Sequence, residues 1–548
     1  MPLQKNQVLT LRVERLSSDG SGVAHSPDGE TVFIPGAAPG DEARVRIVKD
    51  CKRYAFGILD EVLTPSPDRI PVDCAVAGPC GGCSLRHLDY AAELRAKQEN
   101  VADAFARIGG LDVPVLPIVG SPEVNRYRNK VQFPVGVDKS GKPCIGFYAG
   151  RTHRIVPCPD CRLQPGVLNE IGNALCAFFA EKGIQPYSEE TGRGLVRHIF
   201  LRRGAHSGQI MVCLVCTCAR LPSAEELCTR LKAQFAEITT ILLNVNAKNT
   251  NVILGTETHT LYGPGYIEDT LCGVPVQLGP LSFYQVNTLA AEQLYGIAAQ
   301  YAQLTPDDLL LDLYCGMGTI GLSMAAHCRE LIGVEIVPEA IESAKANAVR
   351  MGADVAAKSR FFCADAGQAA TRLAAEGLHP DIVMLDPPRK GCDEATLSAV
   401  VRMSPRRVVY VSCNPATAAR DAAWLEQNGY RAEKVQPVDL FPRTRHCEAV
   451  LLLSKLHVDR HIEVEVSMEE LDVTAAESKA TYNEIREHVW EHHQLKVSNL
   501  YIAQVKQKHG IIERENYHKA KNENAKQPKC PKEKEDAIVE ALKHFQMI

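Results

Sequence analysis

The stretch LLLDLYCGMGTIGLSMA (309–325) decides the fold of the region that carries the chemistry of this 548-residue chain. It is typical of a buried strand, a turn with Gly316, Gly318 and Gly321 in the spacing G-x-G-x-x-G, and the start of a helix. Glycines at this spacing let the backbone approach a ligand closely. Glu335 ends the next apolar run, about 20 residues on, where a carboxylate can accept hydrogen bonds from ribose hydroxyls. The stretch predicts a nucleoside-containing cofactor, and NAD and S-adenosylmethionine both fit it.

Two more apolar runs downstream of this loop end in polar residues. DIVMLDPPRKG (381–391) reaches Asp386, and RVVYVSCNP (407–415) reaches Cys413. Strands alternate with helices from about residue 280 to the run AVLLLSKL near 456, which predicts a parallel, Rossmann-like α/β sheet. Open α/β sheets bind ligands at the carboxyl ends of their strands. We therefore expect Asp386 and Cys413 in the same crevice as the glycine loop.

A thiol beside a methyl-sulfonium donor indicates covalent catalysis on a pyrimidine ring. Carbon C5 of the ring is a weak nucleophile until a thiolate adds to C6. A base must later remove the C5 proton, and Glu448 in HCEAV, at the start of the following apolar run, is a candidate. This context favours S-adenosylmethionine over NAD and predicts Cys413 as the nucleophile.

The first 62 residues predict a separate small domain. Short β-rich runs broken by glycine turns over residues 4–62 are typical of a closed, OB-like β-barrel. Basic residues near its end lie beside Tyr54 and Phe56, and this pairing suits phosphate neutralisation together with base stacking. The segment resembles a TRAM domain, an RNA-binding barrel. The basic residues are Arg44, Arg46, Lys49, Lys52 and Arg53.

Five cysteines in loops of the central region predict a metal site or a cluster. Cys80 and Cys83 form one C-x2-C pair and Cys158 and Cys161 another, and two such pairs can hold one tetrahedral zinc ion. Cys74, six residues before Cys80, instead makes three local thiolates plus a remote one, an arrangement that suits an iron–sulfur cluster. The spacing alone leaves the metal open. The same region predicts a helix from Tyr90 to Arg107 and strands such as KVQFPVGV (130–137), an α+β domain.

Seven blocks occur in a fixed order: the barrel, YRNKVQF (127–133), FYQVN (283–287), DLYCGMGTIGL, DPPRKG, SCNP and HCEAV. Over about residues 1–455 the chain therefore resembles the S-adenosylmethionine-dependent RNA uracil-5-methyltransferases, specifically the branch that acts on 23S ribosomal RNA. The resemblance implies a 4Fe–4S cluster, because Cys161-Arg-Leu-Gln164 matches the remote ligand of that family. The implied ligands are Cys74, Cys80, Cys83 and Cys161, which leaves Cys158 as a spare thiol.

The same resemblance implies the roles of other residues. Cys413 would be the nucleophile and Glu448 the proton acceptor. The implied S-adenosylmethionine contacts are Gln285, Tyr314, Glu335 and Asp386, with the backbone at Gly316 and Gly318. The residues implied to lie near the RNA or the target base are Arg128, Asn129, Lys130 and Gln132.

Other functions stay open from the residues alone. A tRNA could be the substrate in place of 23S rRNA. In RNA cytosine-5-methyltransferases a cysteine commonly follows the Pro-Pro of the strand-end motif, and Arg389 here favours uracil. An NAD-dependent oxidoreductase is favoured only by the glycine pattern. An RNA-binding assembly factor on a decayed methyltransferase fold is disfavoured by the intact Cys413, Asp386 and Glu448.

Composition and charge limit the class of protein and the way in which it could bind RNA. Apolar residues make up 45% of the chain, charged residues 23%, and the net charge is −5, so RNA binding must come from local basic faces. No run approaches 18 apolar residues, and the start of the chain lacks the apolar block of a signal peptide. We expect a monomeric cytoplasmic protein that uses no membrane.

Residues 457–548 predict an appended helical module. Two short helices joined at QLKV, with Thr481 and Ser498 as N-caps, resemble a helix-turn-helix. Residues 496–532 hold nine basic and three acidic side chains, a net charge of +6, which favours a phosphate-contacting accessory module. The predicted domains are therefore 1–63, the barrel; 64–270, the central domain with the cysteines; 271–456, the methyltransferase; and 457–548, the basic helical module.

Overall fold

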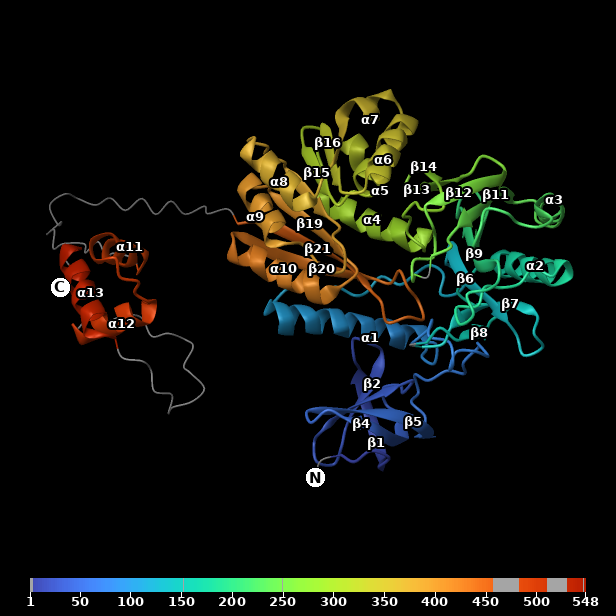
Figure 1. Cartoon of the computed structure of the whole chain (residues 1–548), viewed down its shortest axis with the longest axis horizontal. Coiled ribbons are helices and arrows are strands. Elements are labelled where there is room, and N and C mark those ends of the chain that lie inside the picture. Colours follow the sequence, from blue (N-terminus) through green and yellow to red (C-terminus); the bar gives the residue numbers. More distant parts are fainter. Residues whose placement is uncertain (1–2, 151, 249, 457–481, 510–529, 546) are drawn as a thin grey trace. The chain divides into compact units, whose positions relative to one another are not determined.

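A computed structural model describes residues 3–150, 152–248, 250–456, 482–509, 530–545 and 547–548 (Figure 1). The chain divides into two compact units, Met1–His457 and Val458–Ile548, which are taken separately here. Within the described ranges, no helix combines the length and the apolar character that a membrane crossing requires.

The N-terminal segment folds into a closed five-stranded barrel, as the sequence predicts. Strand β4 shows why: its residues alternate exposed and buried, so that Val45 and Ile47 fill the interior beside Val32 and Ile34 of β3. Pairing of β1 with β4 closes the barrel in the order β1-β2-β3-β5-β4. The strands are β1 (Val8–Leu16), β2 (Ser21–His25), β3 (Thr31–Pro35), β4 (Glu42–Asp50) and β5 (Tyr54–Thr64).

Helix α1 (Tyr90–Asp103) confirms the helix predicted from Tyr90 onward, and a π-helical turn continues it over Ala104–Gly109. Its N-cap is Asp89, whose side chain accepts a hydrogen bond from Ala92 N. The helix contacts β20 (Tyr430–Val438) and α10 (Pro415–Gln427) of the C-terminal sheet region, and its Ala96 joins a small apolar cluster with Leu16 of the barrel. Its sequence is polar, yet Glu93 and Lys97 are buried. The reason is an ion network described below.

The central region is a seven-stranded sheet in the order β12-β11-β10-β9-β6-β7-β8, packed against two helices. The predicted strand KVQFPVGV is β6. A separate hairpin, β13 (Ile267–Leu271) with β14 (Val274–Leu278), spans the predicted boundary between residues 270 and 271. The sheet elements are β6 (Lys130–Val137), β7 (Pro143–Tyr148), β8 (Ile155–Pro157), α2 (Gly166–Lys182), β9 (Val196–Arg203), β10 (Ile210–Cys216), α3 (Ala224–Gln234), β11 (Ile238–Val245) and β12 (Glu257–Tyr262).

The C-terminal part of this unit is a Rossmann-like α/β sheet in the order β17-β16-β15-β18-β19-β21-β20 (Figure 1). Strands β15 to β19 are parallel, as predicted, but β21 runs antiparallel to both neighbours. The short segment 439–447 joins β20 to β21, and a parallel pair would need a crossover of a dozen residues or more. The strands are β15 (Leu309–Leu313), β16 (Glu330–Glu335), β17 (Ser359–Cys363), β18 (Ile382–Leu385), β19 (Arg407–Ser412), β20 (Tyr430–Val438) and β21 (Glu448–Lys455).

Helices cover both faces of this sheet, one core cluster lying on each. They connect the parallel strands, as the alternating sequence pattern predicts. The helices are α4 (Thr288–Ala302), α5 (Thr319–Met324), α6 (Pro338–Met351), α7 (Ala353–Lys358), α8 (Ala366–Ala375), α9 (Glu394–Met403) and α10 (Pro415–Gln427).

The second unit is helical, as expected. Helices α11 (Tyr482–His493) and α12 (Asn499–Lys508) confirm the predicted pair, and the side chain of Ser498 caps α12 at Tyr501 N. A third helix, α13 (Lys532–His544), was not predicted, and its Ile538 and Leu542 complete a small core with α11 and α12. Thr481 and the basic residues Arg514, Lys519, Lys521, Lys526 and Lys529 lie outside the described residues.

Candidate functional site

The glycine loop after β15 has the backbone that close ligand approach requires. Gly316 and Gly318 have φ angles of 55° and 79°, and Gly318 is the N-cap of α5. Gly321 has no room for a side chain, because an added Cβ would lie 2.7 Å from Asp312 Oδ2. Tyr314 also has a positive φ, 66°, which is uncommon for a residue with a side chain. The loop thus combines an open backbone with tight packing between strand and helix.

Three carboxylates surround this loop. Glu335, the last residue of β16, accepts hydrogen bonds from Gly316 N at 3.2 Å and Ile336 N at 2.8 Å. Asp312 is buried beneath the loop, where burial and the charges of Asp386 and Glu335 raise its pKa to about 8. Burial also raises the pKa of Asp386, after β18, to about 7. Asp312 Oδ1 has no hydrogen-bond partner among the residues that the structure describes. Burial thus favours the neutral forms of Asp312 and Asp386 in the free protein, and a positively charged sulfonium ligand would favour their ionised forms. The sequence analysis missed Asp312.

Gln285 reaches the same crevice from the segment that precedes α4. Tyr295 hydrogen-bonds Thr319 of α5 at 3.3 Å, and Gln285 is its other side-chain partner. The segment is held from the central sheet: Arg202 donates to Gly279 O and Ser282 O at 2.7 Å each. Asn129 donates to Gln285 O at 2.7 Å. Gln285, Asp386 and the glycine loop therefore lie around one crevice.

Cys413 and Glu448 lie at the end of β19 and the start of β21. Ser412 pairs with Ala449 in antiparallel register, so the next two residues along this ladder, Cys413 and Glu448, oppose each other. Cys413 is half-buried, and burial together with the charge of Glu448 raises the pKa of its thiol. Glu448 is buried, and burial with the charge of Asp386 raises its pKa to about 8. A thiol and a carboxyl of raised pKa thus face the same edge as the glycine loop.

Arg389, in the DPPRKG stretch, is the positive charge at this pair. Its hydrogen bond and its charge oppose the rise in the pKa of Cys413, and its charge does the same for Glu448. Its own carbonyl accepts hydrogen bonds from Asn414 at 2.9 Å and Thr417 at 3.3 Å. The loop after β18 is thereby tied to the residues that follow Cys413. A cation here favours the ionised forms of both groups.

The cysteines of the central region converge on one pocket of about 280 Å³. Burial raises the pKa of Cys80, and the charges of Cys161 and Cys74 raise it further. The pKa of Cys161 falls instead, to about 6, because the Cys158 thiol and the backbone N–H groups of Leu163 and Gln164 donate to its sulfur. The pocket is lined by Cys74, Cys80, Cys83, Cys158 and Cys161. Over the described ranges, however, no three His, Cys, Asp or Glu side chains form a group that could hold a metal ion.

The predicted RNA-facing residues divide into two groups. Arg128, Lys130 and Gln132 line the cysteine pocket, and burial beside Arg202 and Arg128 lowers the pKa of Lys130 to about 8. Asn129 is only 4% exposed, and its amide donates to Thr288 Oγ1 as well as to Gln285 O. Asn129 therefore supports the segment that carries Gln285, a role that no sequence pattern predicts.

The barrel carries an aromatic group on its outer face. The rings of Phe33, Tyr54 and Phe56 lie 5.7–5.8 Å apart, and Tyr54 is 41% exposed. Of the predicted basic residues, Arg44 and Arg46 pair with Glu61 and Asp60 of β5. The exposed Lys49, Lys52 and Arg53 form no ion pair with any residue in the described part of the chain. Aromatic side chains and unpaired basic side chains thus occur together at β5 and the loop before it.

Comparisons with known proteins agree with this geometry. A family model described as tRNA (Uracil-5-)-methyltransferase matches residues 274–456, and a TRAM domain model matches residues 2–59. An uncharacterized RNA methyltransferase of Halalkalibacterium halodurans is 43% identical over 453 residues, 82% of this chain and 98% of the relative. One from Bacillus cereus is 41% identical over 456 residues, 83% of this chain and 98% of that relative.

A solved structure is also similar. The tRNA (uracil-54, C5)-methyltransferase of Pyrococcus abyssi, in complex with S-adenosyl-L-homocysteine, matches with a TM-score of 0.65 and 27% identity. The match covers 82% of this chain and 100% of the Pyrococcus chain.

The α/β sheet, its acidic glycine-loop crevice and the TRAM barrel define an S-adenosylmethionine-dependent RNA methyltransferase. The identity and coverage of the relatives, together with the matching family model, establish the family: the chain belongs to the RNA uracil-5-methyltransferase family. This result excludes the NAD-dependent oxidoreductase that the glycine pattern alone left open. Both matching models end before residue 457.

Proposed function

We propose that this enzyme methylates C5 of a uridine in 23S rRNA through a transient bond between Cys413 and C6 of the base. The observation that carries the proposal is the pairing of Ser412 with Ala449, which sets Cys413 opposite Glu448 at the edge of the crevice. Arg389 at this pair supports the proposal, because its charge favours the thiolate that must attack.

The chemistry follows from these groups. S-adenosylmethionine, when bound, supplies an activated methyl group. The Cys413 thiolate adds to C6, the electron pair moves to C5, and C5 takes the methyl group as its bond to the sulfonium sulfur breaks. Glu448 then removes the C5 proton, the C6–sulfur bond breaks, and 5-methyluridine leaves with the Cys413 thiolate restored. The target base must leave its stack, because C5 and C6 have to reach groups on the protein.

The remaining crevice residues are proposed to hold the methyl donor. Glu335 would accept hydrogen bonds from the ribose hydroxyls, and Gly316 and Gly318 would let the donor approach the backbone. Gln285, Tyr314 and Asp386 complete the proposed contacts. Their convergence on one crevice, with the unpartnered Asp312 oxygen beneath it, supports the assignment.

A 4Fe–4S cluster is proposed at the cysteine pocket. Cys74, Cys80, Cys83 and Cys161 would hold it, and its irons would join the loop at 74–83 to the segment near 161. The donor set fits, since the sulfurs of these cysteines line one pocket and neighbouring groups lower the pKa of Cys161, which favours its thiolate.

RNA contacts are proposed at two surfaces. The outer barrel face with Tyr54 and Phe56 suits stacked bases, and Lys49, Lys52 and Arg53 suit the phosphates. Arg128, Lys130 and Gln132 would contact RNA beside the cysteine pocket.

One second candidate has an observation in its favour: the similar Pyrococcus enzyme acts on uracil-54 of tRNA. Mapping 5-methyluridine in rRNA and tRNA, from cells with and without this protein, separates the candidates. A site in 23S rRNA that disappears with the protein supports the proposal. If a tRNA site disappears instead, the substrate is a tRNA and not 23S rRNA. If a 5-methylcytidine disappears, the enzyme methylates cytosine and not uracil.

A further inference from the structure

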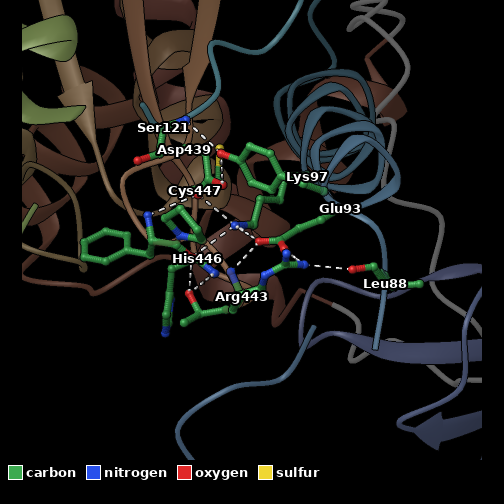
Figure 2. Close-up of polar contacts among 12 residues, drawn as sticks. Leu88, Glu93, Lys97, Ser121, Asp439, Arg443, His446 and Cys447 are labelled. Carbon is green, nitrogen blue, oxygen red and sulfur yellow. Dashed lines mark hydrogen bonds and ion pairs between the residues drawn. The ribbon is translucent and has the colours of Figure 1, made fainter. Parts of the chain in front are cut away.

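A buried ion network joins α1 to the segment 439–447, which leads into Glu448. Lys97 Nζ donates to Glu93 Oε1 at 2.7 Å, to Asp439 Oδ1 at 2.8 Å and to Phe441 O at 3.2 Å (Figure 2). The side chains of Glu93, Lys97 and Asp439 are at most 2% exposed. We call Glu93, Lys97, Asp439, Tyr90 and Arg443 the Lys97 network.

The outer members of the Lys97 network bind the same segment. The backbone N–H of Arg443 donates to Glu93 Oε1 at 2.7 Å, and its guanidinium donates to Leu88 O at 2.8 Å. The Tyr90 hydroxyl donates to Asp439 Oδ2 at 3.0 Å and accepts from Ser121 N at 2.7 Å. The positive charges of Lys97 and Arg443 balance the negative charges of Glu93 and Asp439. Burial alone would lower the pKa of Lys97, but Asp439 and Glu93 raise it, so the lysine stays charged.

The segment is also held from the methyltransferase side. Asn287, the N-cap of α4, donates to Leu440 O and to Ser121 Oγ, both at 3.0 Å. Thr444 Oγ1 donates to Phe441 O at 2.8 Å. Bonds therefore fix the segment at 439, 440, 441 and 443, and β21 begins five residues after the last of these.

Stability alone does not account for such a network. A buried ion pair is often no more stabilising than apolar side chains of the same size, so packing could hold α1 against the sheet equally well. Charged hydrogen bonds differ because each one specifies a particular atom and direction. Glu448, the first residue of β21, pairs with Val438, the last residue of β20. Asp439 directly follows Val438, so the Lys97 network holds the backbone next to the strand partner of Glu448. Cys413 instead follows β19, which has no bond to this network in the described part of the chain.

We propose that the Lys97 network is a positioning device for Glu448: α1, outside the methyltransferase sheet, sets the placement of the residue that removes the C5 proton. The inference rests on the function proposed above. If segment 439–447 is loosened, removal of the C5 proton should become slower. Thiol addition and methyl transfer, which do not use Glu448, should keep nearly the wild-type rate.

Asp439→Asn tests this, since it keeps the size of the side chain and leaves the Lys97–Glu93 pair in place. Tyr90→Phe, which removes only the hydroxyl, is the second variant in case the first unfolds. Glu226→Gln, which weakens an exposed ion pair with Arg230 on α3, is the matched control. Each variant is mixed with substrate RNA and radiolabelled S-adenosylmethionine in a single turnover. Formation and decay of the covalent protein–RNA adduct are followed on denaturing gels, and thermal unfolding is recorded in parallel.

We expect Asp439→Asn and Tyr90→Phe to form the adduct at nearly the wild-type rate and to resolve it roughly tenfold more slowly or worse, as misplacement of a catalytic group predicts. The control should match the wild type in both steps. Equal slowing of both steps, or unchanged resolution in folded variants, would overturn the positioning role. No adduct in the wild type and none in Glu448→Gln would instead overturn the proposed function, and this inference with it.

Discussion

Ser412 of β19 and Ala449 of β21 are direct partners in an antiparallel ladder. The ladder ends there, and the residues just beyond, Cys413 and Glu448, come from segments 35 positions apart in the chain yet oppose each other. Because the last strand, β21, runs antiparallel to β19, its first residue, Glu448, lies near the Cys413 thiol. A parallel β21 would start at the other edge of the sheet.

Glu448→Gln separates proton removal from the earlier steps. The amide cannot accept the C5 proton, so the covalent adduct should form, carry the methyl group and then persist. Denaturing gels and mass spectrometry of the adduct measure this, with the exposed Glu433→Gln on β20 as the matched control. Because burial disfavours the charged carboxylate, the variant should unfold at the wild-type temperature or above. Normal product release by Glu448→Gln would remove this residue from its role.

The raised pKa of Glu448 gives the reaction a pH dependence. In the free protein the carboxyl has a pKa of about 8, so below pH 8 it is mostly protonated and cannot accept a proton. We expect kcat/KM, which reports groups of the free enzyme, to rise with pH from 6 to about 8 as Glu448 ionises. It should go on rising above pH 8 as the Cys413 thiol ionises. In Glu448→Gln, adduct formation should still rise with pH because the thiol pKa is also raised. A flat wild-type profile over this range would contradict the assignment.

The cysteine pocket makes a prediction for individual thiols. Anaerobically purified protein should contain iron and sulfide in equal amounts, and Cys83→Ala or Cys161→Ala should lose both. Cys158→Ala should keep the cluster, since Cys158 is not among the four proposed ligands, although it lines the same pocket. Metal analysis and visible absorbance provide the readout. Zinc in place of iron, or equal loss in Cys158→Ala, would favour the ligand set of the two C-x2-C pairs.

A contact could be predicted from the sequence when its residues belong to one local pattern, and not when they lie far apart along the chain. The glycine loop, Asp386 and Cys413 follow from local patterns, because strand ends in a parallel sheet share one edge. Glu93 and Lys97 look like an exposed i, i+4 pair in a polar helix, and only folding brings Asp439, 342 residues from Lys97, to meet them. Asn129 and Arg202 likewise act on backbone carbonyls, which leave no mark in the sequence. Asp312 could have been predicted from the sequence, because a carboxyl group inside the apolar run LLLDL (309–313) is expected to be buried.

The basic helical module should contribute to RNA binding through phosphates. Deleting residues 457–548 should weaken affinity and reduce the slope of log Kd against log salt, by about 0.7–0.9 for each lost phosphate contact. Because Met1–His457 is a compact unit by itself, the truncated enzyme should keep its fold. Fluorescence anisotropy over a salt series measures both quantities. Equal affinity and slope with and without the module would dismiss this role.

The central claim, a bond between Cys413 and the target base, is tested most directly by trapping it. In RNA with 5-fluorouridine at the target position, C5 carries no proton for Glu448 to remove, so the adduct should not resolve. We predict a stable, methylated protein–RNA species whose digested peptide carries the nucleotide on Cys413, and none in Cys413→Ser, while Cys218→Ser forms it normally. Methyl transfer to unmodified RNA by Cys413→Ser, or attachment to any other cysteine, would contradict the account.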